Sequence, residues 1–239
     1  MGITGIIGAM ASEVELLKAA MEEGSEMEIA GRDFSYGLLE GRPVVVVQCG
    51  EGKTSAAICA QAMVDRFHVD RLINTGVAGG LAAELRVGDL VIGTDAVHHD
   101  FDLTALGYVR GYVAGGDGQK PTRFQADTEL ISLCKRAAAQ MDEDISCLEG
   151  TIASGDIFVD DSGLKRHLIE QFGAAAAEME GAAIAQTAQA NGVPFVLIRA
   201  ISDLAEQEAN VSFASFEKQA ADRSARLVMR MLTLLSEES

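Results

Sequence analysis

Short apolar runs alternate with helix-forming segments along the 239 residues of this chain, which restricts it to folds built from both kinds of element. The run 44–47 has no polar position, which is typical of a strand covered on both faces. Strands that alternate with helices predict a mostly parallel sheet wrapped by helices. We expect strands at residues 3–9, 34–39, 44–48, 71–75, 90–93, 148–154 and 194–201, and helices at residues 12–23, 54–67, 127–141, 162–172, 181–191 and 213–235.

Glycine marks several of the expected connections. Residues 40–43 predict a hairpin turn, and the glycine-rich residues 76–80 predict a tight loop after the strand at 71–75. The segment 98–124 is longer than an ordinary connection and carries five glycines, so we expect a functional or interface loop there. No repeat or linker interrupts the pattern, which predicts a single domain over residues 1–239.

The chain is strongly acidic. Lys and Arg number 19 against 36 Asp and Glu, a net charge of −17. This charge repels phosphate backbones and anionic lipid headgroups, so nucleic acid and membrane surfaces are poor partners. A neutral or cationic small molecule remains compatible with the composition.

The cysteines and the N-terminal segment indicate a reducing compartment. Cys49, Cys59, Cys134 and Cys147 show no CxxC spacing, which favours free thiols over a zinc site or a redox pair. The apolar N-terminal residues lack the basic start of a signal peptide and lead directly into acidic positions. We therefore expect a cytoplasmic protein without a membrane span.

Carboxylates follow several of the expected strands. Ligands of open parallel sheets collect at the carboxyl ends of the strands, where Glu13, Glu180 and Asp203 are expected to lie. Each has a purely structural alternative. Glu13 suits the first turn of a helix, Asp203 suits a turn, and the segment from Glu178 to Glu180 suits a solvated helix start with Met179 in the core.

Metal and phosphate sites have weaker support. His98 and His99 lie beside Asp100 and Asp102, but no further ligand follows at a suitable spacing. The glycines at 76–80 do not have the order of a dinucleotide fingerprint or a P-loop, and Lys53 is a lone cation after Gly52. We expect no metal and no cofactor.

Seven segments together resemble one enzyme family in order and spacing along essentially the whole chain: GIIGAM with Glu13 downstream, INTGVAGGL, VGDLVIG, HHDFDLTALGY, SGDIFV, EMEGAAIA and VPFVLIRAISDLA. They resemble the 5'-methylthioadenosine/S-adenosylhomocysteine nucleosidases of the purine nucleoside phosphorylase superfamily. The resemblance implies a three-layer α/β/α domain with a mixed, partly barrel-like central sheet, and a homodimer. It also implies hydrolysis of an N-glycosidic bond, which releases adenine and a 5-thioribose product.

The resemblance assigns roles by matching position. Glu13 would activate water and Asp203 would protonate adenine at N7, while Met179 and Glu180 would hold the ribose hydroxyls. The loop from Leu103 to Tyr108 would reach the partner subunit's site. The other substrate-binding positions that it implies are Met10, Ala78, Gly79, Phe158, Val159, Glu178, Arg199, Ser202 and Phe213.

The chemistry of these groups favours water over phosphate as the nucleophile. Cleavage of the C1'–N9 bond builds positive charge on the sugar and negative charge on adenine, which calls for an acid at the base and anionic groups near the sugar. One carboxyl must be protonated and another ionised, and we expect Asp203 to have the raised pKa. A phosphorylase would need clustered cations. Arg199 is the main cation nearby, and we expect it to orient Glu13 or Glu180.

Three positions depart from the family pattern. Glu51 replaces an apolar residue near the 5'-alkylthio group, Val77 replaces a serine, and Leu106 replaces a phenylalanine in the partner-contributed loop. Glu51 either accepts a cationic 5' substituent or points to solvent. Other 5'-modified nucleosides, such as 6-amino-6-deoxyfutalosine or 5'-deoxyadenosine, therefore stay open as substrates. A nucleoside phosphorylase and a non-catalytic nucleoside-binding protein are further alternatives.

Overall fold

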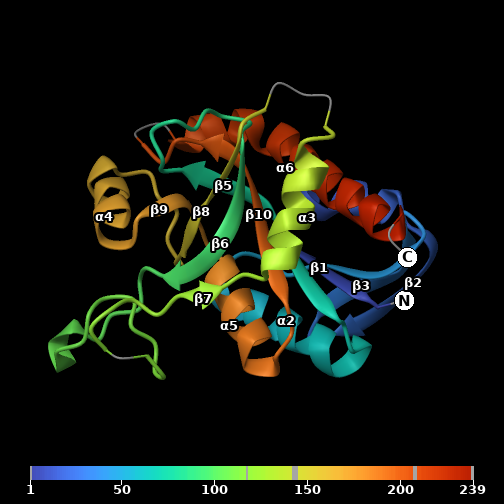
Figure 1. Cartoon of the computed structure of the whole chain (residues 1–239), viewed down its shortest axis with the longest axis horizontal. Coiled ribbons are helices and arrows are strands. Elements are labelled where there is room, and N and C mark those ends of the chain that lie inside the picture. Colours follow the sequence, from blue (N-terminus) through green and yellow to red (C-terminus); the bar gives the residue numbers. More distant parts are fainter. Residues whose placement is uncertain (1, 117, 142–144, 207–208, 238–239) are drawn as a thin grey trace.

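A mixed β-sheet forms the centre of the molecule (Figure 1). The computed structural model describes residues 2–116, 118–141, 145–206 and 209–237, so the ends of the predicted domain, residue 1 and residues 238–239, lie outside the described residues. Within these ranges the sheet has ten strands. They are β1 (Thr4–Gly8), β2 (Glu22–Ile29), β3 (Arg32–Leu39), β4 (Arg42–Gln48), β5 (Arg71–Gly80), β6 (Leu90–His98), β7 (Phe124–Gln125), β8 (Cys147–Ser154), β9 (Ala174–Glu178) and β10 (Phe195–Asp203).

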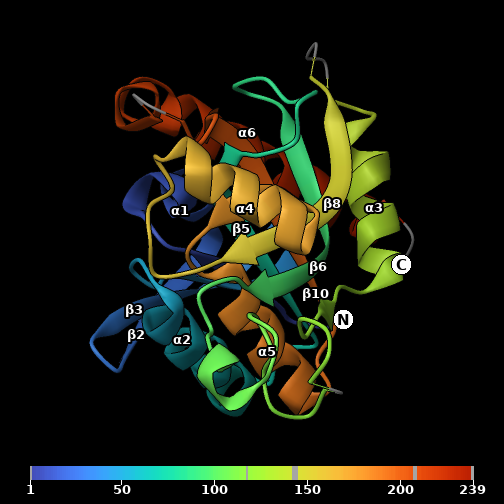
Figure 2. The same cartoon turned by 90° about the vertical axis from the view of Figure 1, so that its left-hand side faces the viewer.

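Helices cover both sides of the sheet and so confirm the expected three layers (Figures 1 and 2). The α-helices of the described residues are α1 (Ala11–Ala19), α2 (Lys53–Phe67), α3 (Thr128–Ala138), α4 (Ser162–Phe172), α5 (Gly181–Asn191) and α6 (Ala209–Glu237). On one side α1 and α3 pack against α6, on the other α2 packs against α5, and α4 contacts β8 and β9. None of these helices is long and apolar enough to cross a membrane.

Five strands of the sheet close on themselves. They follow the order β10-β6-β8-β9-β5, and β5 pairs again with β10. The pairs β5–β10, β6–β8 and β8–β9 are parallel, whereas β6–β10 and β5–β9 are antiparallel. Of the ten strand pairings among the described residues, five are parallel and five are antiparallel, so the sheet is mixed and less parallel than the alternation of elements predicts. The mixed, partly barrel-like sheet implied by the resemblance is confirmed.

Residues 76–80 correct the sequence prediction. They form no loop but complete β5, and Gly79 and Gly80 pair with Ala177 and Ala176 of β9. Glycine is required by close approach, because a Cβ atom on Gly76 would clash with the Glu13 carboxylate. The strand β9 was not among the expected strands, since its alanines lack the branched side chains that favour strands.

The N-terminal helix is shorter than predicted. Helix α1 ends at Ala19, and the following acidic residues form β2, an exposed edge strand that pairs with β3. Residues 22–29 show no helical or alternating apolar pattern, so this strand is not predictable from the sequence. Charged side chains on an edge strand prevent pairing with another chain. The closing helix is longer than predicted and begins at Ala209.

The segment 98–124 is mostly irregular, as the sequence predicts. It holds one turn of 3₁₀ helix, Thr104–Leu106, and ends at β7, which pairs with β6. Leu106 is 71% exposed.

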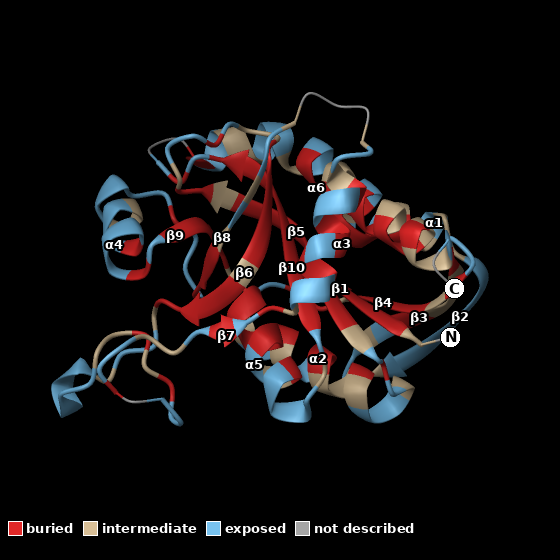
Figure 3. Cartoon of the chain, in the orientation of Figure 1, coloured by how far each residue is buried: buried red, intermediate tan, exposed pale blue. Residues whose placement is uncertain are grey.

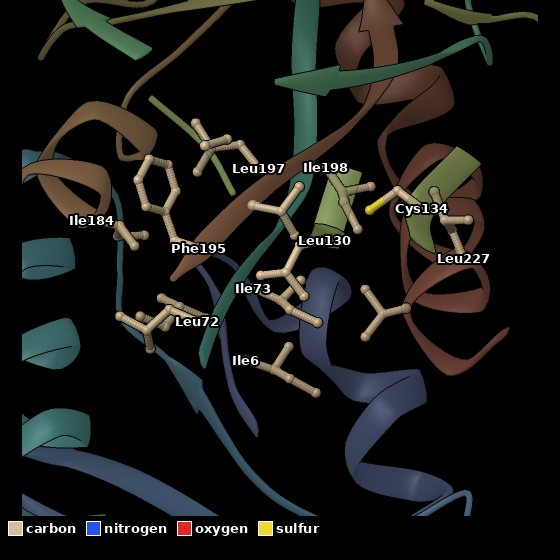
Figure 4. Close-up of a cluster of buried hydrophobic side chains, with 14 of the residues drawn as sticks. Ile6, Leu72, Ile73, Leu130, Cys134, Ile184, Phe195, Leu197, Ile198 and Leu227 are labelled. Atoms are coloured by element: carbon tan, nitrogen blue, oxygen red, sulfur yellow. The ribbon is translucent and has the colours of Figure 1, made fainter. Parts of the chain in front are cut away.

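The apolar core extends over both faces of the sheet (Figure 3). Figure 4 shows Ile6 of β1, Ile73 of β5 and Ile198 of β10 packed together with Leu130 of α3 and Leu227 of α6. Because parallel and closed sheets are covered on both faces, their strands consist of continuous apolar runs. The core thereby fixes the ends of β1, β5, β9 and β10 close together.

The closed part of the sheet leaves no room for an added side chain at Gly93 of β6. A Cβ there would lie 2.9 Å from Ile152 Cγ1 and 3.0 Å from Leu197 Cβ. We predict that Gly93→Ala lowers the free energy of unfolding by about 1–3 kcal/mol, measured by urea denaturation. Gly24→Ala is the control, because nothing lies within 4 Å of its added Cβ. It is expected to change stability by less than ~0.5 kcal/mol, and equal losses in both variants would contradict the prediction.

Candidate active site

A cavity of about 230 Å³ lies at the carboxyl ends of β1, β5, β9 and β10. Most of the predicted site residues line it: Met10, Glu13, Ala78, Gly79, Phe158, Glu178, Met179, Glu180, Ser202, Asp203 and Phe213. A smaller cavity of about 30 Å³ adjoins it and is lined in part by Val159. A larger groove of about 540 Å³ lies beside Arg71 and Pro194, at the amino ends of β5 and β10. Ligands of α/β sheets bind at the carboxyl ends of the strands, which favours the 230 Å³ cavity over the larger groove.

Glu13 is held by three backbone amides. Its Oε2 accepts hydrogen bonds from the N–H groups of Ala9 (2.6 Å) and Met10 (3.0 Å), and its Oε1 accepts one from Val77 (2.9 Å). The short turn from β1 into α1 brings the first two donors to the carboxylate, and the extended end of β5 brings the third. Burial raises the pKa of Glu13, while the charge of Arg199 and these amides oppose the rise.

Arg199 and Glu178 form a buried ion pair, of which Glu178 lines the cavity and Arg199 does not. The guanidinium of Arg199, on β10, contacts the carboxylate of Glu178 on β9 and the side-chain oxygen of Asn74 on β5. The hydroxyl of Ser154 donates to the same carboxylate. Burial raises the pKa of Glu178, but Arg199 and Ser154 lower it by more, so the net direction is down. The prediction that Arg199 orients Glu13 or Glu180 is therefore corrected, because its hydrogen bonds go to Glu178 and Asn74 and to the Ile198 carbonyl.

Glu180 lies at the start of α5, between two other anions and the N-terminus of α2. Its Oε1 accepts a hydrogen bond of 2.7 Å from the N–H of Gly52. Burial and the neighbouring charge of Glu178 raise the pKa of Glu180 to about 8. In the folded protein this carboxyl is therefore largely protonated at neutral pH.

Asp203 ends β10 and lines the same cavity. Its Oδ2 accepts a hydrogen bond from the Ser202 hydroxyl (2.9 Å), and its Oδ1 accepts one from the Ala205 N–H (2.8 Å). Burial raises the pKa of Asp203, against these two hydrogen bonds and the charge of Lys165. The expected direction for Asp203 is thus found. The pKa of Glu13 is raised as well. The two carboxyls differ in their hydrogen-bond donors, which number three for Glu13 and two for Asp203.

The remaining predicted residues form the walls. The rings of Phe158 and Phe213 meet edge to face, with centroids 5.7 Å apart. Arg199 does not line the cavity but supports it from below. Of the three positions that depart from the family pattern, Glu51 and Val77 line the cavity, and Leu106 belongs to the exposed loop. Glu51 is both exposed and part of the cavity wall.

Sequence reasoning missed the groups that hold the carboxylates in place. Backbone donors at Ala9, Gly52 and Val77 leave no trace in side-chain identity. Asn74 lies in an apolar strand and is buried. A buried amide is costly without hydrogen-bond partners, so an asparagine at this position indicates a polar partner nearby. It joins Arg199 to β1 by donating to the Ile7 carbonyl at 2.9 Å.

The polar residues around His98 and His99 form hydrogen bonds and an ion pair with other side chains. His98 lies 3.0 Å from the Gln186 side-chain oxygen, and Asp100 pairs with Lys53. Among the described residues, no group of three or more histidine, cysteine or acidic side chains is arranged to hold a metal ion.

Comparison with known proteins gives one family. The model of the phosphorylase superfamily matches residues 3–233. A 5'-methylthioadenosine/S-adenosylhomocysteine nucleosidase of Geobacillus thermodenitrificans (strain NG80-2) is 47% identical over 235 residues, which cover 98% of each chain. The nucleosidase of the same name from Neisseria meningitidis, solved in complex with methylthio-immucillin-A, is 41% identical with a TM-score of 0.91, over 98% of this chain and 99% of that one.

A further solved structure carries a different name. The futalosine hydrolase of Helicobacter pylori strain 26695 is 33% identical with a TM-score of 0.90, over 97% of each chain. Its identity is lower than that of the Geobacillus and Neisseria nucleosidases, which are 41–47% identical to this chain. The chain belongs to the phosphorylase superfamily and, within it, to the family of 5'-methylthioadenosine/S-adenosylhomocysteine nucleosidases.

Proposed function

We propose that the chain is an N-glycosyl hydrolase that cleaves 5'-methylthioadenosine and S-adenosylhomocysteine to adenine and the 5-thioribose product. The observation that carries this proposal is the convergence of Glu13, Glu180 and Asp203 on one cavity at the strand ends. A protein that only binds nucleosides has no need of a carboxylate placed to activate water.

The three carboxyls divide the reaction between them. Asp203, with its raised pKa, donates a proton to adenine N7 as the C1'–N9 bond breaks. Glu13, whose ionised form is stabilised by three amides, removes a proton from the attacking water. Glu180 accepts hydrogen bonds from the ribose hydroxyls, together with the backbone of Met179. Positioned acid–base groups of this kind contribute about 10²–10⁴-fold each to the rate.

The charges around the cavity favour hydrolysis over phosphorolysis. Among the described residues that line it, none carries a positive charge, and five carry carboxyl groups: Glu13, Glu51, Glu178, Glu180 and Asp203. The nearby Arg199 is bound to Glu178. A phosphate dianion needs cations or clustered donors. Water is therefore the nucleophile of the proposed reaction.

The assembly and location belong to the same proposal. The loop from Leu103 to Tyr108 exposes Leu106 and Tyr108, and Phe101 beside it is exposed as well. Exposed apolar groups gathered on one loop suit a homodimer in which this loop reaches the partner's cavity. The four cysteines are unpaired, which suits the cytoplasm.

The proposed activity is tested by adenine release from a panel of nucleosides, with and without phosphate. We expect release from 5'-methylthioadenosine and S-adenosylhomocysteine that does not depend on phosphate. Asp203→Asn keeps the shape of the side chain but cannot donate a proton, and it is expected to lose about 10²-fold or more in turnover.

Each other outcome points to an alternative. Phosphate dependence would indicate a phosphorylase, and faster cleavage of 6-amino-6-deoxyfutalosine or 5'-deoxyadenosine would indicate a different nucleosidase. Binding without base release from any nucleoside would indicate a binding protein.

The raised pKa of Glu180 predicts a pH dependence of stability. Its pKa is about 8 in the folded protein against a usual value of 4.5, so its contribution to stability is fully present below pH 4.5 and is lost as the pH rises through 8. Glu180→Gln cannot ionise. We predict that unfolding free energy, measured by urea denaturation, falls less between pH 7 and pH 9 in Glu180→Gln than in the unaltered protein. Parallel pH curves would show that Glu180 does not titrate in this range.

Glu51 predicts a preference between substrates. Its carboxylate lines the exposed side of the cavity, and no described residue forms a hydrogen bond or ion pair with it. An ammonium group on the 5' substituent would provide that partner. We predict that Glu51→Ile lowers kcat/KM for S-adenosylhomocysteine relative to methylthioadenosine by about tenfold, the worth of one partly exposed charge contact. Glu15→Ile is the control, since Glu15 does not line the cavity, and an unchanged ratio in Glu51→Ile would exclude this role.

A further inference from the structure

The turn that follows Asp203 has a backbone conformation that favours glycine but holds an alanine. Ala205 has φ of 52° and is fully buried. Its N–H donates the 2.8 Å hydrogen bond to Asp203 Oδ1. The left-handed conformation is disfavoured for residues with a Cβ, so the surroundings must hold the turn. The position of the Asp203 carboxyl depends on what holds it.

Lys165 of α4 bonds to the residues on both sides of Ala205. Its Nζ donates to the Leu204 carbonyl at 2.8 Å and pairs with Glu206 Oε1 at 2.7 Å. The Lys165 side chain is only 17% exposed, whereas that of Glu206 is 57% exposed. One ammonium group thus spans the strained residue.

Packing joins the turn to α4 and to the cavity wall. Ala205 shares an apolar cluster with Leu168 and Phe172 of α4. On the cavity side, a Cβ added to Gly79 would lie 3.1 Å from both Ala205 Cβ and Asp203 Oδ1, so little free space remains there. Displacement of the turn therefore displaces the carboxyl.

We propose that Lys165 is a positioning residue, which holds the turn of Leu204, Ala205 and Glu206 so that the Asp203 carboxyl points at the base of the bound nucleoside. Lys165 lines neither the 230 Å³ cavity nor the smaller one beside it, so we expect it to act through the turn and not on the substrate directly. Its positive charge also opposes the rise that burial causes in the pKa of Asp203. This role rests on the proposed function of Asp203 as the proton donor.

The test compares steady-state kinetics of Lys165 variants on methylthioadenosine. Lys165→Met is expected to lower kcat about tenfold with KM changed less than ~2-fold, because misplacement of an acid affects the chemical step more than binding. Lys165→Arg keeps a donor that reaches the Leu204 carbonyl and is expected to restore most of kcat. Glu206→Gln is the matched control and is expected to retain nearly full activity, since the bond from Lys165 to Leu204 remains.

A second variant separates positioning from stability. Glycine adopts the conformation of residue 205 without strain. In the Ala205→Gly background the loss of kcat caused by Lys165→Met is expected to be smaller, although the double variant loses more stability because a buried methyl group is removed. If Lys165 only stabilised the fold, the losses of kcat caused by Lys165→Met and by Ala205→Gly would add in the double variant.

The outcomes are distinct. A kcat within ~2-fold of the unaltered enzyme in Lys165→Met, equal effects on kcat and KM, or no rescue in either Lys165→Arg or the Ala205→Gly background would overturn the proposal. A Lys165→Met protein that does not fold, as judged by circular dichroism, would also overturn it when Lys165→Gln behaves alike. Absence of adenine release by the unaltered enzyme would instead overturn the proposed function.

Discussion

The guanidinium of Arg199 ties together the strands on which the candidate site is built. It bonds Glu178 of β9 and Asn74 of β5 from its own place on β10, and Asn74 extends the chain of contacts to β1. A buried ion pair is tolerated only when its remaining polar groups find partners, and removal of one partner is strongly destabilising. The same charge opposes the rise that burial causes in the pKa of Glu13 and of Glu180, and it helps to hold the pKa of Glu178 below its usual value. One buried cation therefore supports both the closed sheet and the acidic cavity above it.

Much of this fold could be predicted from strand and helix patterns, and the failures have physical causes. The branched run 44–47 and the apolar strand ending at Asp203 follow the rule for strands covered on both faces. Strand β9 is not predicted because its four alanines carry no strand preference. Strand β2 is not predicted because an exposed acidic edge strand needs no apolar pattern. The glycines at the end of β5 suggest a turn, so the sequence predicts a loop there. They are there because Glu13 and β9 approach too closely for a side chain.

In the candidate site, the proposed catalytic side chains are predictable from the sequence, whereas the backbone groups that bind them are not. Glu13, Glu180 and Asp203 were predicted as carboxylates at strand ends, and the structure brings them to one cavity. The partners that set their pKa values were not predictable, since most are backbone N–H groups whose positions depend on the complete fold. Arg199 shows the limit clearly. Its proximity to the carboxylates followed from the strand, but the choice of Glu178 over Glu13 or Glu180 depends on how β9 closes the sheet.

The acidity of the cavity bears directly on how the proposed reaction is accelerated. Burial and the charges of Glu178 and Glu13 raise the cost of ionising Glu180, so this carboxyl stays largely protonated at neutral pH. A positive charge that develops on the sugar beside Glu180 favours its ionised form. The interaction between the two is then stronger in the transition state than with the neutral substrate, which is the condition for lowering a barrier. The Glu180 carboxyl, which is costly to ionise in the free enzyme, is thereby matched to a cationic sugar.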